Sequence, residues 1–281
     1  MRFRPPRFAL RNKVILTTGR LFGHTRHFEP LPDVGWDFST SGYVRPHLET
    51  PQFLDDAGQV IHYGERWGND RAPDDTYSVV SHPERFAPLI EVADAMIDFL
   101  TGTYEVTMTD VPNLEDEREP RFPGIKEPRF TEAFGPTFLR AIKLTPQRPD
   151  EAPLIIAFTS FPGIHLWAGA LYELDMPDCG CDACDDDWTQ CAEVLESNVL
   201  AVVNGTFSEL WRGRRLVTNV AYPEGASGST CQAKYLPYSA AYIAKARHKL
   251  RDLPNGWQPW TRRQLRDRQI SLPRVRPPAV D

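Results

Sequence analysis

The spacing of apolar residues indicates three helices. Leu89 to Leu100 forms an apolar stripe with acidic residues on the opposite face, and Gly102 is placed to end it. A second stripe runs from Trp188 to Val202, and a third helical segment, from about Ser239 to Arg251, stops before a Pro-Asn-Gly turn. Apolar residues repeating every three or four positions lie on one face of an α-helix. The pattern therefore predicts three amphipathic helices.

Alternation of apolar and polar residues indicates strands in other parts of the chain. Thr103 to Thr109 alternates throughout, and Pro162-Gly163 separates two apolar runs as a hairpin turn would. Residues 43–80 read as loops with short strands around a turn at residues 55–58. The other predicted strands are Leu139–Thr145, Leu154–Phe161, Ile164–Leu171, Arg215–Tyr222 and Thr230–Tyr235, with turn-rich residues 223–229 between the last two.

These elements predict an α+β fold with a mainly antiparallel sheet and about three flanking helices, because strands follow one another in runs. We expect a single domain over residues 43–260. Residues 1–42 show no sustained periodicity of apolar residues. We interpret them as an N-terminal arm or as an extension from an upstream start. Residues 110–136 are a long proline-rich excursion, and residues 261–281 are an Arg-rich C-terminal tail.

Charge divides the chain into an acidic body and basic ends. The net charge is −6, but residues 1–40 and 255–281 each carry +4, which leaves about −14 on residues 41–254. An acidic body makes a nucleic-acid partner unlikely on electrostatic grounds. No segment approaches the ~18 to 20 apolar residues that cross a bilayer, so no membrane partner is expected. With no secretory apolar run near residue 1, we expect a cytoplasmic protein.

Candidate chemistry is concentrated in Met176 to Trp188. Three of the five cysteines, Cys179, Cys181 and Cys184, fall within six positions here, separated by Gly, Ala and Asp. An odd number of cysteines in a reducing compartment favours thiols or metal ligands over disulfides. A Cys-x-x-Cys pair presents two sulfurs to one tetrahedral ion, and Gly180 lets the chain double back to add a third. The pattern therefore predicts a metal site, with zinc as its ion.

The fourth ligand is less clear from the sequence. Cys191 completes the predicted set of Cys179, Cys181, Cys184 and Cys191, although it lies on an apolar stripe where a small buried hydrophobe is the simpler interpretation. Asp182, Asp185 and the distant His165 are alternatives. Cys231 alternates with Ala233 and Tyr235, which is typical of a core residue.

Thiol exchange is the rival chemistry, because a Cys-x-x-Cys pair before a helix is similar to the thioredoxin arrangement. The five aspartates between Asp178 and Asp187 oppose a bare thiolate, whereas a divalent cation would offset their repulsion. A purely structural interpretation also stands, since Asp185 to Asp187 fit a helix N-cap and first turn around an inert thiol cluster. No phosphate-binding loop, Gly-x-Ser-x-Gly or His-Glu-x-x-His motif is present, so no catalytic residue can be named.

The chain resembles a bacterial family, number 6226 among domains of unknown function, whose hallmark is Cys-Gly-Cys-Asp-Ala-Cys-Asp, here Cys179 to Asp185. The likeness spans roughly residues 43–260 and excludes residues 1–42, the segment around 110–136 and the tail. It implies a single bacterial cytosolic domain without an established activity, and Cys191 lies outside the motif. The other segments that carry it are Tyr43–Pro46, Tyr63–Gly68, Asp75–Leu89, Phe161–Gly163 and Leu253–Trp260.

From these observations we expect a non-catalytic binding module whose cysteine cluster holds a structural metal, zinc, and no other cofactor. Removal of such a metal is expected to unfold the domain. The alternative is an enzyme that uses Cys179, Cys181 and Cys184 for thiol redox chemistry or for metal-assisted hydrolysis. A role as the binding partner of another protein is a third hypothesis, which no sequence feature of its own supports.

Overall fold

The computed structural model describes residues 41–68, 70–114, 138–223 and 225–264. Residues 1–40 of the predicted arm, residues 115–136 of the predicted excursion and residues 265–281 of the predicted tail lie outside them. The described residues contain three α-helices, which confirms that prediction. The helices are α1 (Pro88–Thr103), α4 (Trp188–Val203) and α5 (Ala240–Arg251).

A five-stranded antiparallel sheet forms the centre of the fold, which confirms the α+β class. Each strand pairs with the strand before it in sequence, in the order β3-β4-β5-β6-β7. Thr159 pairs with Gly163, so the predicted hairpin turn at Pro162-Gly163 is also confirmed. The strands are β3 (Val106–Asp110), β4 (Phe138–Pro146), β5 (Leu154–Thr159), β6 (Gly163–Ala168) and β7 (Tyr172–Met176).

The predicted strand Ile164–Leu171 is wrong at its end, and β7 was not predicted. The chain turns at Gly169, which has a φ of +59°. The backbone N–H groups of Ala170 and Leu171 then donate to the carboxylate of Glu209, at 2.7 Å each. This turn therefore depends on a residue 38 positions further along the chain, which local alternation cannot reveal.

A second antiparallel sheet has the order β10-β9-β8. It comprises β8 (Phe207–Arg212), β9 (Arg215–Tyr222) and β10 (Gly225–Gln232). The prediction of turns through residues 223–229 is wrong, because β10 pairs with β9 from Gly225 onward. Its glycines and serines lie on an exposed edge strand, where no core packing is required of them. A small hairpin of β1 (Phe53–Leu54) and β2 (Val60–Ile61) flanks the predicted turn at residues 55–58.

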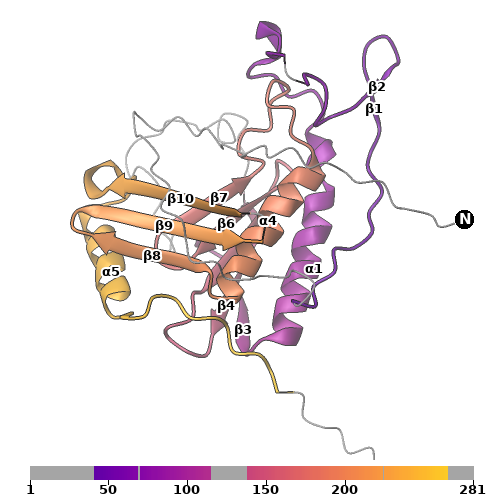
Figure 1. The fold of residues 1–281 in the computed structure, drawn as a ribbon. Helices are drawn as coiled ribbons and strands as arrows, with labels where there is room; N and C mark the ends of the chain where they lie inside the picture. The colour runs from indigo at the N-terminus through magenta and orange to yellow at the C-terminus, as the bar shows by residue number, and fades with distance from the viewer. Residues whose placement is uncertain (1–40, 69, 115–137, 224, 265–281) are drawn as a thin grey trace, which may run out of the picture. The chain divides into compact units, whose positions relative to one another are not determined.

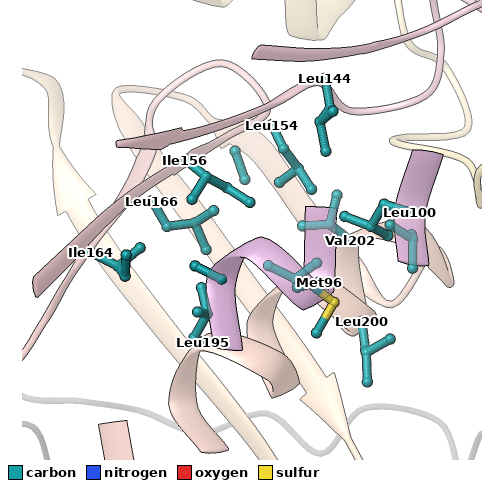
Figure 2. Packing of buried hydrophobic residues seen from close by; sticks show 14 of the residues in the cluster. Met96, Leu100, Leu144, Leu154, Ile156, Ile164, Leu166, Leu195, Leu200 and Val202 are labelled. Carbon is teal, nitrogen blue, oxygen red and sulfur yellow. The ribbon is translucent and has the colours of Figure 1, made fainter. Parts of the chain in front are cut away.

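The core lies between the helices and the five-stranded sheet. Helices α1 and α4 lie side by side (Figure 1), α1 contacts β3 and β6, and α4 contacts β7, β8 and β9. Apolar side chains from both helices and from three strands meet in one cluster, which Figure 2 shows. Those labelled there are Met96, Leu100, Leu195, Leu200 and Val202 from the helices, and Leu144, Leu154, Ile156, Ile164 and Leu166 from the strands.

The cysteine-rich segment connects β7 to α4 (Figure 1). We call residues Pro177–Asp187 the Cys loop. Met176 before it and Trp188 after it are both buried in the main core. Core packing therefore fixes both ends of the Cys loop, and its shape depends on what contacts it in between.

Candidate metal centre

Three sulfur atoms converge in the Cys loop. The Sγ atoms of Cys179, Cys181 and Cys184 all lie within 4.8 Å of one another, and the Cys181 thiol donates to the Cys184 sulfur at 3.5 Å. A tetrahedral zinc ion bound at about 2.3 Å holds its sulfur ligands about 3.8 Å apart. The three cysteines are therefore already near the spacing that one ion requires.

The backbone reaches this arrangement through two left-handed residues. Gly180 has a φ of +75°, and a Cβ atom there would lie 2.8 Å from the ring of Phe161. Asp185 has a φ of +55°, an unusual conformation for a residue with a side chain. The predicted role of Gly180 in bending the chain is consistent with this geometry. Asp185 shows that other contacts must hold the second bend.

A buried arginine, Arg85, holds the Cys loop. It lies in the short helix η3 (Pro83–Phe86) and is only 2% exposed. The guanidinium group donates to the backbone carbonyls of Gly180 at 2.9 Å, Asp186 at 3.2 Å and His82 at 3.2 Å. One cation thus binds a carbonyl group between the first two cysteines and another after the third, a use that suits the forked donors of arginine.

Arg66 holds the loop at its second bend. Its backbone N–H donates to Asp185 Oδ2 at 2.8 Å and its Nε to Oδ1 at 2.5 Å. Its Nη2 also donates to the carbonyl of Asp182, which receives a further bond from the indole of Trp67 at 3.1 Å. The guanidinium carbons of Arg66 and Arg85 lie 4.4 and 4.2 Å from the centre of the Tyr63 ring. Tyr63 therefore ties the two arginines together by cation–π contacts.

The irregular segment Thr76–Ser81 completes the support. The buried carboxylate of Asp182 accepts from the Ser81 hydroxyl at 2.5 Å and from its backbone N–H at 3.3 Å. The backbone N–H of Asp182 donates to the carbonyl of Val79 at 2.8 Å, and that of Ala183 to Thr76 at 3.1 Å. We call Tyr63–Trp67 and Thr76–Arg85 the clamp, since these residues hold the Cys loop from outside it.

These contacts change the predicted role of the aspartates. Asp182 and Asp185 engage Ser81 and Arg66, so their carboxylates already have partners other than a metal. Asp187 is the N-cap of α4 and accepts from the Gln190 N–H at 2.8 Å. The N-cap interpretation is therefore confirmed for this residue. Three of the five acidic side chains shape the loop, and its negative charge is partly compensated by arginines.

The remaining candidates for a fourth ligand lie outside the group of three sulfurs. Cys191 is buried on α4, as expected of a small apolar residue, and burial raises the pKa of its thiol. Its role as a ligand stays a prediction. His165 lies on β6, where its Nδ1 pairs with Asp175, and its ring lies 3.9 Å from that of Trp167. Cys231 is only half-buried, on β10, and donates to the Gln232 carbonyl at 3.5 Å.

The three thiols differ in their electrostatics. Hydrogen bonding from the Cys184 thiol lowers the pKa of Cys179 to about 6, with further help from the N–H and thiol of Cys181, although burial and Asp178 oppose the shift. The pKa of Cys184 is raised, chiefly because its thiol donates to Cys179. Burial and then the negative charge of Cys179 raise the pKa of Asp186 to about 6. Cys179 therefore becomes a thiolate at a lower pH than Cys184 does.

A family model matches most of the chain. Residues 49–264 match the family described as "Family of unknown function (DUF6226)". The chain belongs to this family. No curated protein and no solved structure matches it. Within the described part of the chain, none of the helices has the length and apolar character needed to cross a membrane.

The DUF6226 match covers the Cys loop and the clamp together. Sequence reasoning found the three cysteines but missed Arg66, Arg85, Tyr63 and Ser81, which position them. The available signal was that these residues lie in Tyr63–Gly68 and Asp75–Leu89, segments that carried the resemblance. Aromatic and arginine residues in loops without a periodic pattern indicate contacts with another part of the molecule.

Proposed function

We propose that this DUF6226 protein is a metal-binding module whose Cys179, Cys181 and Cys184 hold one zinc ion. The observation that carries the proposal is the convergence of their three sulfur atoms within 4.8 Å. In this proposal the site binds its metal ion and catalyses no reaction.

Zinc suits this set of ligands better than a hard cation does. Thiolates select soft or borderline metals such as zinc, whereas magnesium and calcium prefer oxygen ligands. Cys179 offers a thiolate near neutral pH, and a bound divalent ion displaces the protons of the other two thiols. The five cysteines of the described residues are unpaired, which suits a reducing compartment, and we infer the cytoplasm.

The clamp supports a metal site that does not depend on metal for its shape. Arg66 and Arg85 bind the Cys loop through carbonyl and carboxylate groups and leave the sulfurs out of these contacts. A large core anchors both ends of the loop. We therefore infer that metal removal loosens the loop and leaves the domain folded, unlike a zinc finger, in which the metal supplies the folding energy.

Metal analysis of the purified protein tests the proposal. We expect about one zinc per chain, and loss of that zinc when Cys179, Cys181 or Cys184 is replaced by serine. Cys231→Ser is the matched control and is expected to keep the metal, because Cys231 lies on β10 outside the cluster. The variant Cys191→Ser measures whether the buried thiol is a fourth ligand. Absence of metal from the wild-type protein after zinc loading would reject the proposal.

Thiol redox chemistry is a second candidate, which two observations favour. The sulfurs of Cys181 and Cys184 are 3.5 Å apart, and Cys179 has a lowered pKa. Bond formation between Cys181 and Cys184 would remove two electrons and two protons, which an added disulfide such as oxidised glutathione would accept as two thiols. Thiol titration distinguishes the two candidates. If the wild-type protein contains no metal and reversibly forms one internal disulfide with this reagent, the result supports a redox function.

A further inference from the structure

The ligand set of the proposed zinc site is incomplete within the described residues. Among them, the group of metal-binding side chains consists of Cys179, Cys181 and Cys184 alone. Zinc ordinarily takes four ligands, and a site with three protein ligands keeps its fourth position for a molecule from outside. This inference rests on the proposed function, since it concerns the same ion.

The solvent side of the site shows where such a molecule would approach. Cys184 is exposed, although Cys181 is buried. The clamp segment bonded to Asp182 and Ala183 carries two large apolar side chains in solvent, Tyr77 at 49% and Val79 at 44% exposure. An apolar surface beside a functional site is typical of a docking surface.

The small β1–β2 hairpin carries two further exposed apolar side chains. Its Leu54 and Val60 pair across the hairpin, and both are exposed. Phe53 stacks on His82, whose ring lies at a centroid distance of 4.8 Å, and His82 directly precedes the helix that carries Arg85. The hairpin therefore contacts the clamp through His82, whereas Tyr77 and Val79 lie on the segment that is bonded directly to the Cys loop.

We propose that a partner protein supplies the fourth zinc ligand, through a histidine carried in an apolar segment that docks on Tyr77 and Val79. Charge favours an imidazole over a fourth cysteine. Zinc with three thiolates already has a net charge of −1, and Asp178 and Asp186 act on Cys179 with further negative charge. A neutral imidazole adds no charge to this group, whereas a thiolate adds one.

Full-length protein loaded with cobalt(II) in place of zinc provides the test, because cobalt absorbs visibly according to its ligands. The probes are three synthetic peptides: one histidine flanked by leucine and phenylalanine, the same peptide with alanine for histidine, and a histidine peptide with serine flanks. We expect the first peptide to bind with a dissociation constant about tenfold lower than those of the other two, a difference of ~1.4 kcal/mol, as followed by the change in the cobalt spectrum.

Variants of the protein locate the docking surface. The double variant Tyr77→Ser, Val79→Ser is expected to weaken binding of the apolar histidine peptide about tenfold and to take up cobalt normally. Met108→Ser is the matched control, since Met108 is equally exposed but lies on β3 of the five-stranded sheet. Unchanged circular dichroism of all variants establishes that they fold.

Other outcomes would reject this inference. A cobalt spectrum of four thiolates in the isolated protein, lost in Cys191→Ser, places the fourth ligand inside the chain and leaves zinc binding intact. Free imidazole that binds as tightly as the apolar peptide removes the need for a docking partner. Tighter binding by a cysteine peptide overturns the choice of histidine. Failure to bind cobalt or zinc at all rejects the proposed function itself.

Discussion

Arg85 is a charged side chain almost wholly out of solvent, and its surroundings explain how this is tolerated. It donates to three backbone carbonyls and lies 3.5 Å from the Asp182 carboxylate. Burial lowers the pKa of its guanidinium group, yet arginine stays charged in proteins. A buried cation of this kind is stabilised only while its partners are in place. The shape of the Cys loop and the charge of Arg85 therefore depend on each other.

Replacement of this side chain should be costly. We expect Arg85→Met to lower the free energy of unfolding by ~3 kcal/mol or more, because the carbonyls of Gly180 and Asp186 lose a donor and Asp182 loses a cation. Urea titration measures the loss. Arg71→Met, at an exposed ion pair with Asp74, should change stability by less than ~0.5 kcal/mol. Similar losses in the two variants would contradict the role assigned to Arg85.

A second prediction at this scale concerns the effect of replacing Gly180 on stability. Gly180→Ala should cost ~1–3 kcal/mol more than Gly213→Ala, measured by urea unfolding. Both glycines have positive φ, so both variants share the cost of a left-handed alanine. Only at Gly180 would the new Cβ meet Phe161, whereas no atom lies within 4 Å of it at Gly213. Equal losses would show that the Phe161 ring gives way freely.

The thiol of Cys179 sets a pH dependence in the metal-free protein. Its alkylation rate should rise with pH through about 6 and then level off, because the thiolate is the reacting form and hydrogen bonds from Cys184 lower its pKa. Cys191, whose pKa burial raises, should stay unmodified in the folded protein. The stabilisation from the lowered pKa is complete above the ordinary value near 9 and is lost as pH falls through 6. Mass spectrometry of alkylated peptides checks both residues, and a Cys179 midpoint near 9 would contradict the expectation.

At the scale of elements, local pattern was sufficient for α1, α4 and the most apolar strands, although β8, in which buried and half-buried residues alternate, was not predicted. The stripes of α1 and α4 and the apolar runs of β5 and β6 were all predicted. Strand β7 and the turn before it were missed because Glu209, far along the chain, holds them. The candidate site divides in the same way. Its three cysteines are close in sequence, whereas Arg66 and Arg85 contact other residues of the Cys loop across roughly 100 residues.

The turn before β7 should therefore depend on Glu209 for its stability. Glu209→Leu should lower the free energy of unfolding by ~3 kcal/mol or more, because the N–H groups of Ala170, Leu171 and the Trp257 indole lose a buried acceptor. Thermal unfolding followed by circular dichroism measures it. Glu91→Leu, at an exposed position on α1, is the control and should cost less than ~1 kcal/mol. A small loss in Glu209→Leu would mean that water replaces the carboxylate.

At the scale of the whole molecule, the main core is separate from the proposed metal site. Thirty-six buried residues form this core, and none of Cys179, Cys181 and Cys184 belongs to it. We expect a strong chelator to remove the metal and leave the far-ultraviolet circular dichroism unchanged at 25 °C. The melting temperature should fall only as far as the loss of the zinc-binding free energy from the folded state requires. Loss of helical signal on chelation would instead support the sequence-based expectation of a structural metal.

The distance in sequence between the clamp and the Cys loop has a consequence for biosynthesis. A ribosome releases Arg66 and Arg85 about 100 residues before the cysteines, so the arginines wait unpaired until β5, β6 and β7 have been made. Until then the nascent thiols have no fixed neighbours and titrate like those of a free peptide. A chain that lacked its first 87 residues would keep every cysteine but lose both arginines. Under the proposed function, we expect such a chain to take up zinc less selectively than the full-length protein.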